Sequence, residues 1–151
     1  MKSIAMDTAL GNPIANDQGG KVSAYELNIW AAMRKDYPNA KVRTMPTARY
    51  NCHGYTFGSG RSTISPDEIN KILKDDDYQS VAETNVLPGD IVLYTTADGD
   101  VEHSGIVVER PLPESLNIPL IVSKWGNAPE IVHKANDCRY DFTHARYYRL
   151  K

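Results

Sequence analysis

PGDIVLYTTADGDVEHSGIVVE, residues 88–109, is the stretch that decides the fold of this chain. It contains an apolar run at 90–95, the turn sequence Ala-Asp-Gly-Asp, and a second β-rich run at 101–109. Two such runs joined by a short turn with glycine are typical of a β-hairpin. The stretch therefore predicts two neighbouring antiparallel strands.

Three further strands are predicted towards the C-terminus. The segments 120–126 (LIVSKWG) and 130–135 (EIVHKA) have the composition of strands, and the turn sequence Asn-Ala-Pro-Glu joins them. The proline-rich segment 110–119 interrupts the strands before them, because proline cannot donate a hydrogen bond to a strand ladder. The last strand is expected at 145–150 (ARYYRL).

The first of two helices is predicted within 23–40. Ser23 and Glu26 have the spacing of a capping box, in which each satisfies a free main-chain N–H group of the first turn. The face that packs against the protein is expected to consist of Leu27, Trp30 and Ala31.

The second helix is predicted within 65–76. Ser65 is the expected N-cap, Pro66 occupies the first helical position, and Glu68 is expected to complete a second capping box. Its apolar stripe is expected to be Ile69, Ile72 and Leu73.

Helices followed by a run of antiparallel strands predict an α+β fold, in which one sheet has the N-terminal helices packed on one face. Residues 1–22 lack periodicity and contain scattered Gly, Asn and Pro, so we expect a loose leader or linker there. Residues 23–151 are expected to form a single domain, which is large enough to be stable without disulfides.

The composition argues against several classes of partner. The 151 residues are 41% hydrophobic and 24% charged, which is ordinary for a globular protein, and their net charge of -2 provides no positive field for nucleic acid. The basic, aromatic tail 139–151 alternates like a strand rather than forming a nucleic-acid patch. We expect no nucleic acid, no membrane insertion and no cofactor.

The N-terminus and the two cysteines indicate where the chain is made. The first 20 residues contain no apolar run of signal-peptide length, so cytoplasmic synthesis without Sec-type export is expected. Cys52 and Cys138 are expected to be reduced thiols, because a chain of this size does not depend on one bridge.

The stretch ARYNCHGYTF, residues 48–57, raises the question of what Cys52 does. Asn51 is a good N-cap, and a short helix that begins at Cys52 would direct its free N–H groups at the sulfur. A thiol becomes a nucleophile when its thiolate is stabilised and a base is near. Among the four histidines, His103 has the best setting for the base, because it opens a strand directly after a turn. A buried structural thiol is the alternative for Cys52.

The order of Cys52, LPGDIVLY (87–94) and His103 in HSGIVV (103–108) resembles the NlpC-type and CHAP-type cysteine amidases of the papain-like superfamily. The resemblance runs over residues 48–135 and implies a papain-like catalytic domain that cleaves amide bonds in bacterial cell-wall peptides. It implies Cys52 as the nucleophile and His103 as the general base. The family's usual Asp-Cys-Ser-Gly is Asn-Cys-His-Gly here, so substrate preference does not carry over.

The resemblance also implies a third polar residue that orients the imidazole from the next strand. It aligns with Ser123, but a tight turn would fold His133 back beside Ser123, and we favour His133 for this role. A solvated strand histidine is the alternative for His133.

Four other residues are candidates for supporting roles. The main-chain N–H of Cys52, with Tyr50 or His53 as a side-chain donor, is the expected oxyanion hole. Trp125 would be the wall of a substrate groove or a core tryptophan. Lys124 would attract an acidic substrate or be solvated. Zinc ligation is disfavoured, because the Cys and His spacings match no compact metal motif and Cys52 and His53 are adjacent.

Three functions follow from these residues. The first is a cysteine hydrolase that acts on cell-wall peptide, which without an export signal would suit a toxin domain exported by a specialised secretion system, with an immunity or delivery protein as partner. The second is a cysteine protease, deamidase or acyltransferase that acts on a protein. The third is an inactive papain-like module that binds peptides, which an imidazole of His103 pointing away from Cys52 would favour.

Overall fold

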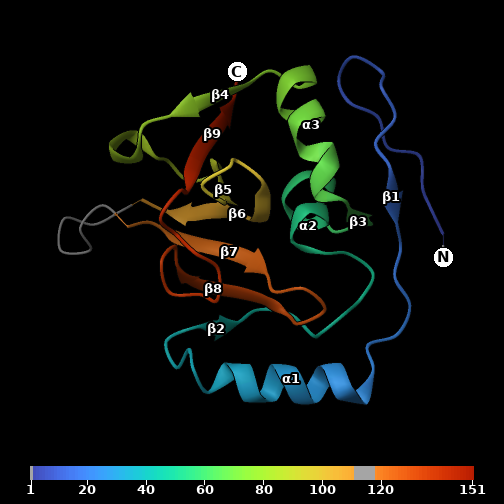
Figure 1. The fold of residues 1–151 in the computed structure, drawn as a ribbon, viewed down its shortest axis with the longest axis vertical. Coiled ribbons are helices and arrows are strands. Elements are labelled where there is room, and N and C mark those ends of the chain that lie inside the picture. The colour runs from blue at the N-terminus through green and yellow to red at the C-terminus, as the bar shows by residue number, and fades with distance from the viewer. Residues whose placement is uncertain (1, 111–117) are drawn as a thin grey trace.

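The computed structural model describes residues 2–110 and 118–151, and its centre is one antiparallel sheet (Figure 1). Seven strands follow the order β2-β8-β7-β6-β5-β9-β4. Their bounds are β2 (Lys41–Val42), β4 (Tyr78–Val81), β5 (Ile91–Thr95), β6 (Val101–Glu109), β7 (Leu120–Lys124), β8 (Glu130–Lys134) and β9 (Arg146–Leu150). The helices are α1 (Ala24–Arg34), α2 (Cys52–Gly58) and α3 (Ile69–Asp75), with short 3-10 turns η1 (Pro66–Glu68) and η2 (Glu83–Asn85).

The strand predictions are confirmed. β5 and β6 form the predicted hairpin, β7 and β8 pair across the Asn-Ala-Pro-Glu turn, and β9 pairs with β5 and β4. Most of the predicted proline-rich interruption, residues 111–117, lies outside the described residues. The α+β class and the antiparallel sheet are therefore as expected.

The register divides the sheet into two faces, because directly paired residues point to the same side. His103 pairs with Tyr94 on the side that we call the Trp125 face, whose core also contains Val92 and Trp125. Ser104 pairs with Leu93 on the opposite side, which we call the α2 face. The hydrophobic core of the α2 face includes Leu93 together with residues of α3.

The helices do not all share one face, which corrects the prediction. Residues of α3 join the core of the α2 face, but Trp30 and Met33 of α1 pack against the core of the Trp125 face. The rings of Trp30 and Trp125 meet edge to face, with centroids 6.2 Å apart. Leu27 is 43% exposed and Ala31 is also exposed, so the predicted stripe is right only for Trp30.

The helix caps agree with the prediction at the serines and differ at the glutamates. The Ser23 hydroxyl accepts a hydrogen bond from the Glu26 N–H, and the Ser65 hydroxyl caps η1 in front of α3. Glu68 does not complete a capping box: its carboxylate accepts from the N–H of Ala15 and pairs with Lys71. The Ala15 N–H, from the N-terminal arm, has replaced the Ser65 N–H that a capping box would use.

Residues 2–18 form an ordered arm that packs along α3, and this corrects the expectation of a loose leader (Figure 1). Met6 and Ile14 of the arm are both 7% exposed and belong to the core of the α2 face. The short strand β1 (Asn16–Asp17) pairs with β3 (Thr63–Ile64). The arm therefore covers apolar surface that a free leader would leave in water.

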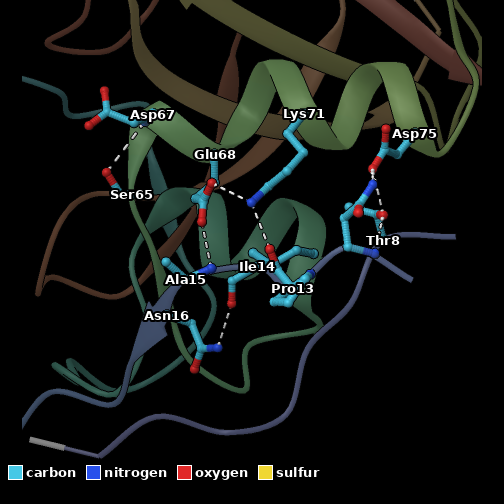
Figure 2. Close-up of polar contacts among 11 residues, drawn as sticks. Thr8, Pro13, Ile14, Ala15, Asn16, Ser65, Asp67, Glu68, Lys71 and Asp75 are labelled. Carbon is cyan, nitrogen blue, oxygen red and sulfur yellow. Dashed lines mark hydrogen bonds and ion pairs between the residues drawn. The ribbon is translucent and has the colours of Figure 1, made fainter. Parts of the chain in front are cut away.

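Polar contacts fix the arm on α3 and η1 (Figure 2). The Thr8 hydroxyl donates to Asp75 over 2.7 Å, and the Lys71 ammonium donates to the main-chain oxygen of Pro13 over 2.6 Å. These bonds join positions more than 50 residues apart in the chain.

Among the described residues, no helix has the length and apolar character that a membrane span requires.

Truncation of Met6 tests whether the arm is part of the folded domain. Met6→Ala is expected to lower the free energy of unfolding by about 2 kcal/mol or more, because the lost thioether leaves a cavity in the core. Leu10→Ala is the control, since Leu10 is 71% exposed and should change stability by less than about 0.5 kcal/mol. Urea unfolding measures both. Equal effects of the two variants would contradict the ordered arm.

Candidate functional site

Cys52 is the first residue of α2, as the sequence predicts. The Asn51 side chain caps the helix by accepting from the Gly54 N–H over 2.8 Å. The same side chain accepts from the N–H of Ile64 and donates to its carbonyl oxygen, over 3.1 and 2.8 Å. Asn51 therefore ties the start of α2 to β3, and through β3 to the arm.

The Cys52 thiol is buried and lies against main-chain N–H groups. Its residue is 7% exposed, and burial raises the pKa of the thiol to about 11. The N–H groups of Ser104 and His53, together with the charge of Lys124, act in the opposite direction on this pKa. At neutral pH the thiol is therefore protonated in this structure.

β6 presents Ser104, not His103, to α2. The Ser104 hydroxyl oxygen lies 2.8 Å from Nδ1 of His53, and the same hydroxyl donates to Thr56 over 2.9 Å. Burial lowers the pKa of His53 to about 4, so its ring is neutral. His53 thus connects α2 to the sheet and is not directed at open solvent.

His103 lies fully buried on the Trp125 face, with its ring stacked on Tyr140. The two ring centroids are 3.7 Å apart and the planes differ by 7°. Within the described residues, neither ring nitrogen of His103 has a hydrogen-bond partner. Burial lowers the pKa of His103 well below its usual value, so the imidazole is neutral.

The structure brings Cys52 and His103 into one neighbourhood without a hydrogen bond between them. The thiol faces the N–H of Ser104, the residue directly after His103. Burial raises the pKa of Tyr140, and a negative charge at Cys52 raises it further, so the Tyr140 hydroxyl lies within electrostatic range of the thiol. The Cys52 thiol therefore lies near the main chain of His103, but the imidazole is on the Trp125 face, and the two groups are not arranged for proton transfer.

Ser123 and His133 meet as predicted. Ser123 Oγ lies 2.7 Å from Nε2 of His133, and Nδ1 of His133 lies 2.7 Å from the carbonyl oxygen of Lys134. Because a carbonyl only accepts, Nδ1 carries the proton and Nε2 accepts from the serine. Both residues are buried, so the solvated alternative for His133 is wrong. Neither residue is hydrogen-bonded to His103.

Trp125 is a core tryptophan in this structure. It is 1% exposed, its indole N–H donates to Ser123 over 3.1 Å, and its ring meets those of Trp30 and Tyr37 edge to face. Of the two roles considered for Trp125, the structure supports the core role.

Tyr50 and Lys124 belong to a second polar cluster on the α2 face. The Tyr50 hydroxyl donates to the Glu130 carboxylate, so its proton is not free for an oxyanion. Lys124 is fully buried and donates to the main-chain oxygen of Thr47 over 2.6 Å and to that of Gly126. The solvated alternative for Lys124 is therefore wrong.

Glu130 and Tyr140 are the polar residues of the site that sequence reasoning missed. Glu130 pairs directly with Lys124 across the β7-β8 hairpin. The opposite charges of these two residues, one on each side of the turn, could have indicated from the sequence that they lie together. Tyr140 lies in the connection to β9, where no periodic pattern places a side chain. Within residues 2–110 and 118–151, no three His, Cys, Asp or Glu side chains gather as metal ligands would.

Comparison of the chain with models of protein families, with curated proteins and with solved structures gave no match.

Proposed function

We propose that this protein is a cysteine hydrolase with a papain-like fold, in which Cys52 is the nucleophile and His103 the general base. Two observations together carry the proposal. The Cys52 thiol lies at the start of a capped helix and faces the N–H of Ser104. The residue before Ser104 is His103, whose ring nitrogens have no hydrogen-bond partner among the described residues. Buried polar groups nearly always have partners, so two free ring nitrogens favour a functional role for His103.

The proposed reaction begins when the Cys52 sulfur attacks an amide carbonyl carbon while His103 accepts the thiol proton. The imidazolium then gives this proton to the leaving amine nitrogen as the carbon–nitrogen bond breaks. Water hydrolyses the thioester and restores the thiol. Main-chain N–H groups at the start of α2 are the oxyanion donors in this account. Tyr50 is not among them, because its hydroxyl already donates a hydrogen bond to the Glu130 carboxylate.

Peptide stems of bacterial cell wall are the proposed substrate, on the resemblance of residues 48–135 to NlpC-type and CHAP-type amidases. Delivery by a specialised secretion system, with an immunity or delivery protein as partner, is part of the same proposal. A protein substrate for proteolysis, deamidation or acyl transfer would use the same Cys52 and His103 chemistry.

An inactive papain-like module that binds peptides is the second candidate. The burial of Cys52, its raised pKa and the lack of a hydrogen bond to His103 favour it.

Mass spectrometry of reaction products separates these functions. Wild-type protein, Cys52→Ala and the matched control Cys138→Ala are incubated with soluble cell-wall peptides and, separately, with a denatured protein mixture. We expect wild-type protein and Cys138→Ala to cleave one kind of amide bond, which gives a product with a new amine and a product with a new carboxylate. Cys52→Ala should form neither product. Peptide binding by all three proteins without any new product supports the inactive module and contradicts hydrolysis.

A further inference from the structure

Lys124 is an anomaly that the proposed reaction does not use. It is a fully buried residue of β7, although a buried ammonium is costly unless it is paired. Within the described residues, no carboxylate forms an ion pair with it. Two of its three N–H groups donate to the carbonyl oxygens of Thr47 and Gly126, which carry no net charge.

The neighbouring carboxylate is occupied by other groups. Glu130 pairs with Lys124 in the sheet register, but its carboxylate accepts from Tyr50 and lies 3.7 Å from the guanidinium of Arg43. The ammonium of Lys124 instead lies over the Tyr50 ring, 5.0 Å from its centroid. The aromatic face offsets part of the desolvation but supplies no counter-charge.

Cys52 and Glu130 are the two ionisable groups whose charge raises the pKa of Lys124, and Glu130 is already engaged by Tyr50 and Arg43. Lys124 anchors Thr47 and Tyr50, the segment that leads into Cys52, and α2 packs on β7. We propose that Lys124 is a positioning residue whose ammonium stabilises the negative charge that forms on the Cys52 sulfur.

The inference rests on the proposed function in that it assumes the sulfur ionises during the reaction. The mutual influence of the two groups supports it: burial lowers the pKa of Lys124 to about 8, and the charge of Cys52 acts to raise it. Other titratable groups around these two side chains are His53 on α2, His103 on β6, Tyr140 beside it, and Glu130 on β8. Both histidines are neutral at pH 7, and among the described residues Lys124 is the cation whose charge lowers the pKa of the Cys52 thiol.

The test is the rate at which iodoacetamide modifies Cys52 between pH 6 and 10, mapped by peptide mass. Lys124→Met removes the charge and keeps most of the volume, Lys124→Arg keeps the charge, and Lys134→Met changes an exposed lysine of β8. At pH 7 the Lys124→Met rate is expected to be about three- to tenfold below that of wild type. The difference should shrink above pH 9, where Lys124 of the wild type has lost its proton and is uncharged like the methionine. Lys124→Arg and Lys134→Met should stay near wild type.

Labelling of Cys138 controls for loosening of the fold, because Cys138 is also buried. A faster Cys138 reaction in Lys124→Met, or equal Cys52 rates in Lys124→Met and wild type at pH 7, would overturn the electrostatic role. The proposed function fails by a different result: Cys52 reacting at the same rate in His103→Ala and in wild type.

Discussion

Gly54→Ala is expected to destabilise the protein by about 3 kcal/mol or more, which corresponds to a fall in melting temperature on the order of 10 °C. A Cβ at Gly54 would lie 1.8 Å from the main-chain oxygen of Ser62 and 3.1 Å from the Cβ of Tyr50. The closer atom belongs to the backbone, so it cannot rotate away as a flexible side chain would. Either α2 or the segment before β3 has to move.

Gly20→Ala is the matched control for this prediction. Nothing lies within 4 Å of a Cβ built at Gly20, so its melting temperature should stay within a few degrees of wild type. Thermal unfolding followed by circular dichroism measures both variants. Equal melting temperatures for Gly54→Ala and Gly20→Ala would mean that α2 does not pack on the Ser62 segment as described.

His103→Ala is expected to lower hydrolysis by about 10²- to 10⁴-fold, the range of a general acid–base residue. His144→Ala is the control, because His144 is exposed and should leave the rate unchanged. Circular dichroism must show that the His103 variant is folded, since the substitution also removes the ring that stacks on Tyr140.

The pH profile gives this prediction a readout that a structural role would not move. A base acts only while unprotonated, and burial holds the pKa of His103 well below its usual value. Wild-type activity should therefore persist as pH falls from 7.5 to about 6, past the ordinary histidine pKa. Loss of activity centred at pH 6.5 would indicate an exposed histidine instead.

The parts of the fold that depend on local patterns could be predicted from the sequence. The 88–109 hairpin, the Ser23 cap, and the Asn51 cap in front of Cys52 each depend on residues within a few positions of one another. The contact of Ser123 with His133 followed from a short turn and an alternating register. Cys52 at the start of a helix was therefore within reach of sequence reasoning.

Long-range contacts account for what could not be predicted. Glu68 has the spacing of a capping box, but its carboxylate instead accepts a hydrogen bond from the N–H of Ala15 in the arm, 53 positions away. The arm looks like a linker because its buried residues, Met6 and Ile14, are isolated and lack a period. Lys124 is fully buried in its strand, but a lysine is almost always solvated, so its residue type predicts the opposite position.

Brief reaction with substoichiometric iodoacetamide near pH 8, with peptide mapping of wild type and His103→Ala, tests most directly whether Cys52 is the nucleophile. Both cysteines are free and buried, so Cys138 is an internal reference in each sample. We predict that wild-type Cys52 reacts faster than Cys138 in spite of its raised pKa, because His103 accepts the thiol proton, and that this preference is lost in His103→Ala. Equal labelling of Cys52 and Cys138, indifferent to His103, would contradict the account and favour the peptide-binding module.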